Sequence, residues 1–477
     1  MPLFSEHYGI RLPQHELDFV DVPIDSDIPL FIDPFAISLR VDRWSQDCNS
    51  TIVSYFDKLL TAIRAGQDSA AIELLCHFRE PNETRLGLSE EEPQGAGIGV
   101  YQAGQLLRAL KSSTAVRTGF ISSLEESELL VKGISYDKIS DLTTNIIRKQ
   151  LVEYTKEQCN LFNLPLSRVP LSPYYSAETG QWISDYFELP VANGKPVLLV
   201  PKIIARYEPS YQHPKYYNNF VLNYLQAEHL SANSSLVKTL KNGRKVVYKS
   251  DIKPTFPGIK ENLFLFSKEH PEIMHAYRDT LMRLEREGKH SIIKTEDETI
   301  VARALITGLQ SISPGNEAYS DYHKFMMGVV EFLFFPYLIY PRKEQEIHQG
   351  RKRIDIVMEN GAMNGVFFRM HQVKGLPCAY ILFECKNYVT DVANPELDQL
   401  AGRFGVNRGK MGLLCCRSFE DRQLFIERCR DTLVDGRGLI LPLDDDTVIR
   451  WLGLIADRNR GALESELTSL VDEVWLS

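Results

Sequence analysis

The chain has 477 residues, of which 44% are hydrophobic and 25% are charged, and its formal net charge is −9. This composition excludes disordered, collagen-like and low-complexity proteins and permits a large buried core. The longest apolar stretch, around Phe325 to Tyr340, is broken by Glu331 and Pro336, so no membrane span is predicted. The start shows no leader-like pattern and the eight cysteines show no paired spacing, which together predict a cytoplasmic protein with reduced thiols.

The sequence of residues 1–200 predicts a first domain, an α+β region to which no role is assigned. The apolar spacing predicts an amphipathic helix from about Ser50 to Ala65. A longer helix is predicted from Asp141 to Phe162, with Ser140 as its N-cap. After a long connection, the run from Pro196 to Ile204 predicts a β-strand.

The sequence of residues 201–315 predicts a second domain, which is mainly helical, basic and rich in aromatic residues. Lys and Arg outnumber Asp and Glu by seven between residues 202 and 260, although the whole chain is acidic. Within this segment Asn242-Gly243 marks a turn, so the run from Lys241 to Tyr248 predicts a basic hairpin. Such a hairpin suits contact with DNA phosphates. The mixture of aromatic and basic residues in this segment equally suits a helix that packs its aromatic side chains inward and exposes its lysines to water.

From residue 316 onward strands and helices alternate, and this order predicts a third domain, an α/β layer with a mixed sheet over residues 316–477. The predicted elements are a helix at 317–335, strands at 338–347, 352–358 and 379–386, a helix at 395–404, a strand at 411–416, a helix at 419–433 and a strand at 438–441.

Two of these strands carry charged residues at apolar positions. Asp355 lies between two isoleucines, and Glu384 and Lys386 follow a run of aliphatic and aromatic residues. Because strand side chains alternate, Glu384 and Lys386 project from the same face. A carboxylate in apolar surroundings is normally paired or bound to a metal. Two carboxylates on adjacent strands suit Mg²⁺ or Mn²⁺, and a lysine beside them can approach an attacking water.

Asp355, followed by Glu384-Cys385-Lys386, resembles the D…(D/E)xK signature of the PD-(D/E)XK, restriction-endonuclease-like superfamily. The resemblance implies that Asp355 and Glu384 bind the metal and that Lys386 positions or activates the nucleophilic water. It also implies that Glu331, on the first helix, completes the metal site. Gln399 matches a helical glutamine that supports the site or contacts the substrate.

The resemblance covers residues 317–443 and implies a fold class. The expected fold is α/β: a C-terminal restriction-endonuclease-like mixed sheet flanked by helices, preceded by a larger, mainly helical α+β region. Basic residues near the site are expected to bind phosphates without reading sequence. These residues are Arg351, Lys352, Arg353, Arg403, Arg408 and Lys410.

The resemblance therefore implies a metal-dependent DNA endonuclease, in a bacterial restriction or anti-phage defence setting. The N-terminal region would serve sensing, targeting or oligomerisation, and the expected partners are DNA, further copies of the chain and a defence-system protein. Two alternatives remain open on the sequence. One is a catalytically inactive nuclease fold that binds or regulates DNA, with the charged cluster serving as structural ion pairs. The other is an RNase.

Overall fold

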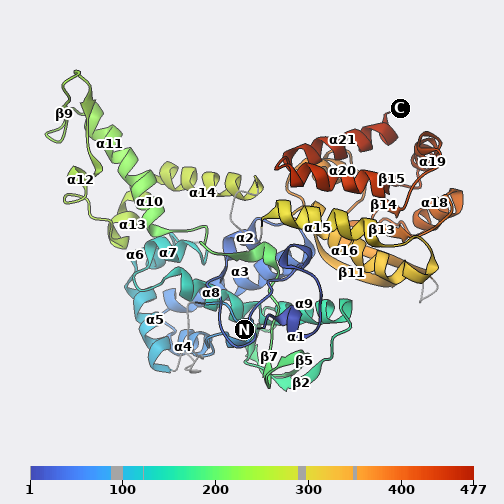
Figure 1. The fold of residues 1–477 in the computed structure, drawn as a ribbon. Helices are drawn as coiled ribbons and strands as arrows, with labels where there is room; N and C mark the ends of the chain where they lie inside the picture. The colour runs from blue at the N-terminus through green and yellow to red at the C-terminus, as the bar shows by residue number, and fades with distance from the viewer. Residues whose placement is uncertain (1, 88–99, 122, 288–296, 348–351, 477) are drawn as a thin grey trace.

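The computed structural model describes residues 2–87, 100–121, 123–287, 297–347 and 352–476. The described residues form two large hydrophobic cores and one small cluster of Val152, Leu189 and Leu198. We call residues 2–287 the N-terminal body and residues 297–476 the C-terminal body; Figure 1 shows the first in blue to green and the second in yellow to red. Among the described residues, every helix is too short or too polar to cross a bilayer.

The N-terminal body is mainly helical, and its strands are short and paired two by two. Its helices are α1 (Phe4–His7), α2 (Pro34–Ser38), α3 (Arg43–Arg64), α4 (Asp68–Leu75), α5 (Val100–Ser112), α6 (Thr114–Arg117), α7 (Glu126–Leu130), α8 (Tyr136–Ile146), α9 (Arg148–Leu161), α10 (His213–Tyr216), α11 (Leu222–Ser231), α12 (Lys249–Ile252), α13 (Lys260–Glu269) and α14 (Pro271–Arg286). Its strand pairs are β1 (Phe31–Ile32) with β8 (Ala205–Arg206), β2 (Ser167–Pro170) with β5 (Tyr186–Leu189), β3 (Tyr174–Ser176) with β4 (Gln181–Ile183), β6 (Val191–Ala192) with β7 (Lys195–Pro196), and β9 (Lys238–Thr239) with β10 (Lys245–Val246).

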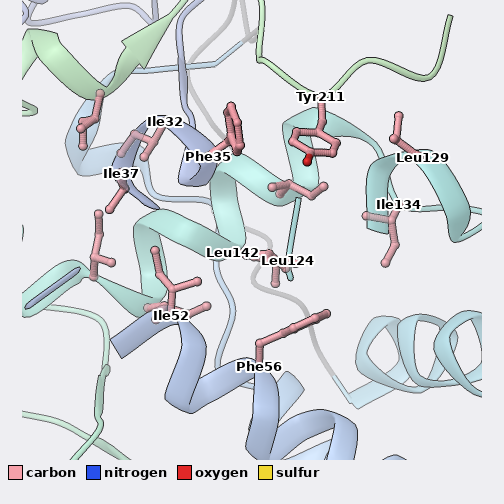
Figure 2. Close-up of a cluster of buried hydrophobic side chains, with 14 of the residues drawn as sticks. Ile32, Phe35, Ile37, Ile52, Phe56, Leu124, Leu129, Ile134, Leu142 and Tyr211 are labelled. Atoms are coloured by element: carbon pink, nitrogen blue, oxygen red, sulfur yellow. The ribbon is translucent and has the colours of Figure 1, made fainter. Parts of the chain in front are cut away.

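The core of this body forms around α3. This helix begins after Asp42, whose carboxylate accepts the backbone N–H of Ser45 and caps the first turn. Figure 2 shows Ile52 and Phe56 of α3 among buried side chains from other helices and loops, with Leu142 of α8 between them and the rest of the cluster. Burial of these side chains is the main term that stabilises the body.

Two predicted elements of the N-terminal body differ in the structure. The predicted helix from Asp141 to Phe162 is two helices, α8 and α9, separated at Ile147, whose backbone leaves the helical region (φ −91°, ψ 14°). Ser140 lies inside α8, where its hydroxyl accepts the N–H of Ile32, so it is not an N-cap. The run from Pro196 to Ile204 is buried, but only its first residue pairs in a strand.

The cores also place the domain boundaries differently from the prediction. The predicted boundary at residue 200 lies inside one core, because Val200 and Phe264 belong to the same buried cluster as Phe4. The predicted boundary at residue 315 follows α15 (Glu298–Ser311), which packs against α20 and contributes to the second core. The two cores therefore divide between α14 and α15. Both differences arise from packing between distant segments, which local composition does not report.

The C-terminal body is built on a five-stranded mixed sheet, as predicted. Its strands are β11 (Leu338–Ile347), β12 (Lys352–Asn360), β13 (Tyr380–Lys386), β14 (Met411–Cys416) and β15 (Leu439–Asp444), in that spatial order. The first three are antiparallel, whereas β13, β14 and β15 are parallel. The helices of this body are α15, α16 (Tyr319–Phe334), α17 (Gly365–Phe368), α18 (Asn394–Ala401), α19 (Arg422–Val434), α20 (Asp445–Ala456) and α21 (Gly461–Trp475).

Strand β11 joins the two bodies. Its pairing with β12 is interrupted between Ile339 and Arg342, where Tyr340 adopts a positive φ of 54°. The N–H of Tyr340 donates to Asp18 of the N-terminal body at 3.1 Å, and Arg342 forms an ion pair with Glu157 of α9 at 3.2 Å. This bulge lets the sheet dock onto the N-terminal body without leaving a buried N–H unpaired.

The stability of the protein is expected to fall as the pH rises from about 4 to about 8, with Asp141 as one cause. Burial, reinforced by the nearby carboxylates of Asp137, Glu80 and Asp27, raises the pKa of Asp141 from 3.8 to about 8. Between these values the folded chain holds a proton that the unfolded chain releases, so the free energy of unfolding decreases by up to about 1.4 kcal/mol per pH unit.

We expect Asp141→Asn to flatten this pH dependence and to stabilise the protein at pH 8 relative to the wild type. Denaturant unfolding at pH 5 and pH 8 measures both effects. Asp57→Asn, on the exposed side of α3, is the matched control. An unchanged slope in the Asp141 variant would contradict the assignment.

Candidate active site

The two predicted metal-binding residues occupy facing backbone positions at the end of the β12–β13 ladder. The ladder pairs Ile356 with Phe383, so Asp355 and Glu384 follow as the next facing positions. The backbone pairing stops there, and the Asp355 carboxylate instead accepts the N–H of Cys385 at 2.9 Å. Asp355 is 8% exposed and Glu384 is 1% exposed. The sequence therefore folds two buried acids onto the middle of one sheet.

Glu384 is surrounded by donors from its own strand and from the segment that begins with α18. Its Oε1 accepts Lys386 Nζ at 2.8 Å and Gln399 Nε2 at 2.7 Å. Its Oε2 forms an ion pair with Arg403. Lys386 Nζ also donates to Gln399 Oε1 at 3.0 Å. The structure thus brings Glu384, Lys386 and Gln399 into direct contact, whereas the Asp355 carboxylate binds the backbone of Cys385.

The charges at this site compensate one another. A carboxylate as buried as Glu384 needs cationic partners, because desolvation of an unpaired charge costs several kcal/mol. Burial lowers the pKa of the Arg403 guanidinium, and the negative charge of Asp355 opposes this effect. Arg403 therefore pairs with Glu384 and also interacts electrostatically with Asp355.

A second set of possible ligands meets at Asp355. The ligand atoms of His323, Asp355 and Cys385 all lie within 4.8 Å of one another, and the three residues are buried. His323 comes from α16, and its Nε2 lies 3.2 Å from the carbonyl oxygen of Asp355. Cys385 projects from the face of β13 opposite to Glu384, because side chains alternate. One nitrogen, one oxygen and one sulfur suit Zn²⁺ and related transition metals better than Mg²⁺.

The Cys385 thiol is protonated in the absence of a metal. A hydrogen bond with the Cys415 thiol and burial raise its pKa well above its usual range. A metal at this position would have to displace that proton, which makes its affinity depend on pH. His323 also lines a cavity of about 630 Å³ between the N-terminal segment and the start of α16, whose wall carries Arg11 and Lys324. Only one signal in the sequence marks His323, namely that it is a polar residue inside an apolar helix.

Glu331 is not at this site. Its Oε1 lies 2.7 Å from Lys202 Nζ of the N-terminal body, and both side chains are almost fully buried. It follows His323 by eight residues on α16, which corresponds to about 12 Å along a helix axis. The expectation that Glu331 completes the metal site is therefore corrected: it faces the junction between the bodies.

The predicted phosphate-binding residues do not form an exposed ring in the described structure. Arg403 is buried against Glu384, so it is a counter-ion of the site. Arg408 donates its Nε to the carbonyl of Arg403 at 3.1 Å. Lys410 donates to the carbonyl of Gly436 and precedes β14, at the end of the strands away from Glu384.

The three remaining predicted phosphate contacts are only partly described. Arg351 lies outside the described residues, and for Lys352 and Arg353 the structure gives only the backbone, in β12. Their expected contact with DNA stays a prediction.

Comparison with known proteins gives one match. A family model described as a domain of unknown function (DUF8370) matches residues 9–212, within the N-terminal body. No curated protein and no solved structure matches the chain. The match covers none of the residues of the candidate active site.

Proposed function

We propose that the C-terminal body is a metal-dependent endonuclease that hydrolyses phosphodiester bonds in DNA. One observation carries the proposal: Glu384, Lys386 and Gln399 form a closed hydrogen-bonded set at the end of β13, with Asp355 at the facing backbone position of β12. The order of elements adds support. Helix α16, β11, the Asp-bearing β12, β13, α18 and β14 follow one another as expected for the superfamily that the sequence resembles.

In this proposal each side chain has a distinct task. Asp355 and Glu384 hold Mg²⁺ or Mn²⁺, which supplies Lewis-acid chemistry at the phosphate when bound. Lys386 orients the attacking water, and Gln399 holds the Lys386 ammonium in place through its amide oxygen. Arg403 neutralises Glu384.

The N-terminal body is proposed to direct this activity, by targeting or by assembly of further copies. Support comes from the junction between the bodies, where Lys202 pairs with Glu331 on α16, the helix that also carries His323. A change in the N-terminal body can therefore reach the site through one rigid helix.

Cleavage of supercoiled plasmid DNA tests the proposal. The wild type is expected to cut in the presence of Mg²⁺ or Mn²⁺, and Asp355→Ala is expected to lose activity because one of the two ligand carboxylates is gone. A chelator should stop the reaction, and Asp57→Ala, on the exposed side of α3, should cut like the wild type. RNA offered in parallel separates a DNase from an RNase. Equal cleavage by Asp355→Ala and wild type would refute the catalytic assignment.

A second candidate function is favoured by one observation. Glu384 already accepts Lys386 and Gln399 on one oxygen and pairs with Arg403 through the other. A site held closed in this way suits a catalytically inactive nuclease fold that binds DNA. That function predicts salt-dependent DNA binding that a chelator leaves unchanged, together with no cleavage under either metal.

A further inference from the structure

A basic arm projects from the N-terminal body, and its function is not explained by the candidate active site. We define the basic arm as residues 222–259, which comprise α11, β9, β10 and α12. Figure 1 shows it in light green, extending away from both bodies with β9 near its far end. Buried Leu225, Val247 and Ile252 hold it together, and Gln226 Nε2 donates to the carbonyl of Val247 at 2.6 Å. These three side chains belong to the N-terminal core, so the arm is a folded projection anchored to that core.

The charge of the arm is opposite to that of the rest of the protein. It contains six lysine or arginine residues and two acidic residues, a net charge of +4, whereas the whole chain has −9 and the remainder therefore −13. A positive projection on an acidic protein concentrates the attraction for a polyanion at one place, because the body repels the same ligand.

Most of these cations are available to a ligand. Lys238, Lys241, Arg244, Lys245 and Lys253 are exposed. Lys238 pairs with Asp251 at 2.6 Å and Lys245 donates to Asn233 at 2.6 Å. Within the described residues, no ion pair is found for Lys241, Arg244 or Lys253. Two of these cations, Lys241 and Arg244, thus lie in the turn between β9 and β10, and Lys253 follows α12.

The shape of the tip suits a duplex groove. Strands β9 and β10 form an antiparallel ribbon, closed by a bond from Leu240 N to Arg244 O of 2.9 Å and by Gly243 at a φ of 80°. The major groove of B-DNA admits a two-stranded ribbon, whereas that of A-form RNA is too deep and narrow to be read. Exposed apolar surface accompanies the charge, with Leu240 37% and Tyr248 46% exposed.

We propose that the basic arm binds double-stranded DNA, with its hairpin in the major groove and its lysines and arginine on the phosphates. The choice of DNA rests on the proposed function, whereas the polyanion site rests on the arm alone. The arm supplies the substrate contacts that the buried Arg403 does not.

Binding of the full-length protein to a short DNA duplex, in a chelator so that no strand is cut, tests the proposal. Neutralising three tip residues in one variant, Lys241→Gln with Arg244→Gln and Lys245→Gln, is expected to reduce the slope of log K against log salt by about 2.7. The affinity gap between wild type and variant should widen about 40-fold between about 200 and about 50 mM salt. The matched control replaces Lys58, Arg117 and Lys132, exposed elsewhere on the N-terminal body, and should bind like the wild type.

Several results would overturn the proposal. One is the same slope for the tip variant and the control, and another is binding to duplex RNA as tight as to duplex DNA. Arm-dependent binding to anionic vesicles with none to DNA would assign the arm to a membrane surface. The binding assay contains no metal and does not depend on cleavage. If Asp355→Ala cuts DNA as fast as the wild type, the nuclease proposal fails, but the measured DNA binding of the arm still stands. Conversely, if the wild type cleaves DNA but the tip variant binds DNA as tightly as the wild type, only the proposal for the basic arm is refuted.

Discussion

Lys386→Met is expected to slow DNA cleavage by about 10²–10³-fold, because it removes a charged donor that is fixed in place before the reaction begins. The Lys386 ammonium lies 2.8 Å from Glu384 Oε1 and 3.0 Å from Gln399 Oε1, and its side chain is only 9% exposed. Two acceptors and burial therefore hold it in one orientation. A group held in this way stabilises developing charge without reorganising, which is the condition for a large rate effect.

The measurement must separate catalysis from folding, since Lys386 is also a counter-ion of Glu384. Initial cleavage rates on plasmid DNA and the free energy of unfolding should be measured on the same preparations. Lys374→Met, at an exposed lysine after the segment Arg369–Val373, is the control and should retain the wild-type rate. If Lys386→Met loses stability but cuts at the wild-type rate, Lys386 is a structural counter-ion and not part of the chemistry.

Glu331→Leu is expected to lower the free energy of unfolding by about 3–5 kcal/mol, because it leaves Lys202 as a buried cation without its partner. Lys202 Nζ lies 2.7 Å from Glu331 Oε1 and also donates to the carbonyl of Leu17 at 2.5 Å. Burial raises the pKa of Glu331 to about 7, and Lys202 opposes that rise. The carbonyl contact and the nearby ring of Phe335 supply no negative charge, and the carboxylates of Asp18 and Glu16, which also interact with Lys202, are expected to replace only part of that of Glu331.

The double variant Lys202→Met with Glu331→Leu should recover most of the lost stability, because two apolar side chains need no counter-charge. Denaturant unfolding of the wild type, both single variants and the double variant completes a mutant cycle and isolates the pair. A loss below about 1 kcal/mol in Glu331→Leu would mean that the pair contributes no more than an exposed ion pair does.

The C-terminal sheet could be predicted from the sequence because its signals are local. Strands β11 and β14 have the predicted bounds, and β12 and β13 differ from theirs only at one end. Each is a run of apolar, β-favouring residues bounded by polar segments, so the pattern needs no tertiary information. That Glu384 and Lys386 project from one face could be predicted for the same reason, because side chains alternate within a single strand.

The features that could not be predicted depend on distant partners. Lys202 meets Glu331 from 129 residues away in the sequence, and nothing near Glu331 distinguishes that pairing from a metal ligand. Arg403 carries the charge of a phosphate-binding residue, but the chain after α18 turns it inward to Glu384. The grouping of segments into cores could not be predicted for the same reason, since shared burial joins segments that composition separates.

The position of β11 has a consequence for any shortened form of the chain. As the outermost strand of the sheet, β11 has one backbone edge that no other strand of the sheet pairs with, and α9 of the N-terminal body packs against it. A fragment that begins at α15 would uncover that edge together with the surface around Ile339 and Tyr340, which is buried in the N-terminal core. Open strand edges recruit other chains and promote aggregation. We therefore expect that the five-stranded sheet is not a detachable module and that its solubility depends on the helix supplied by the other body.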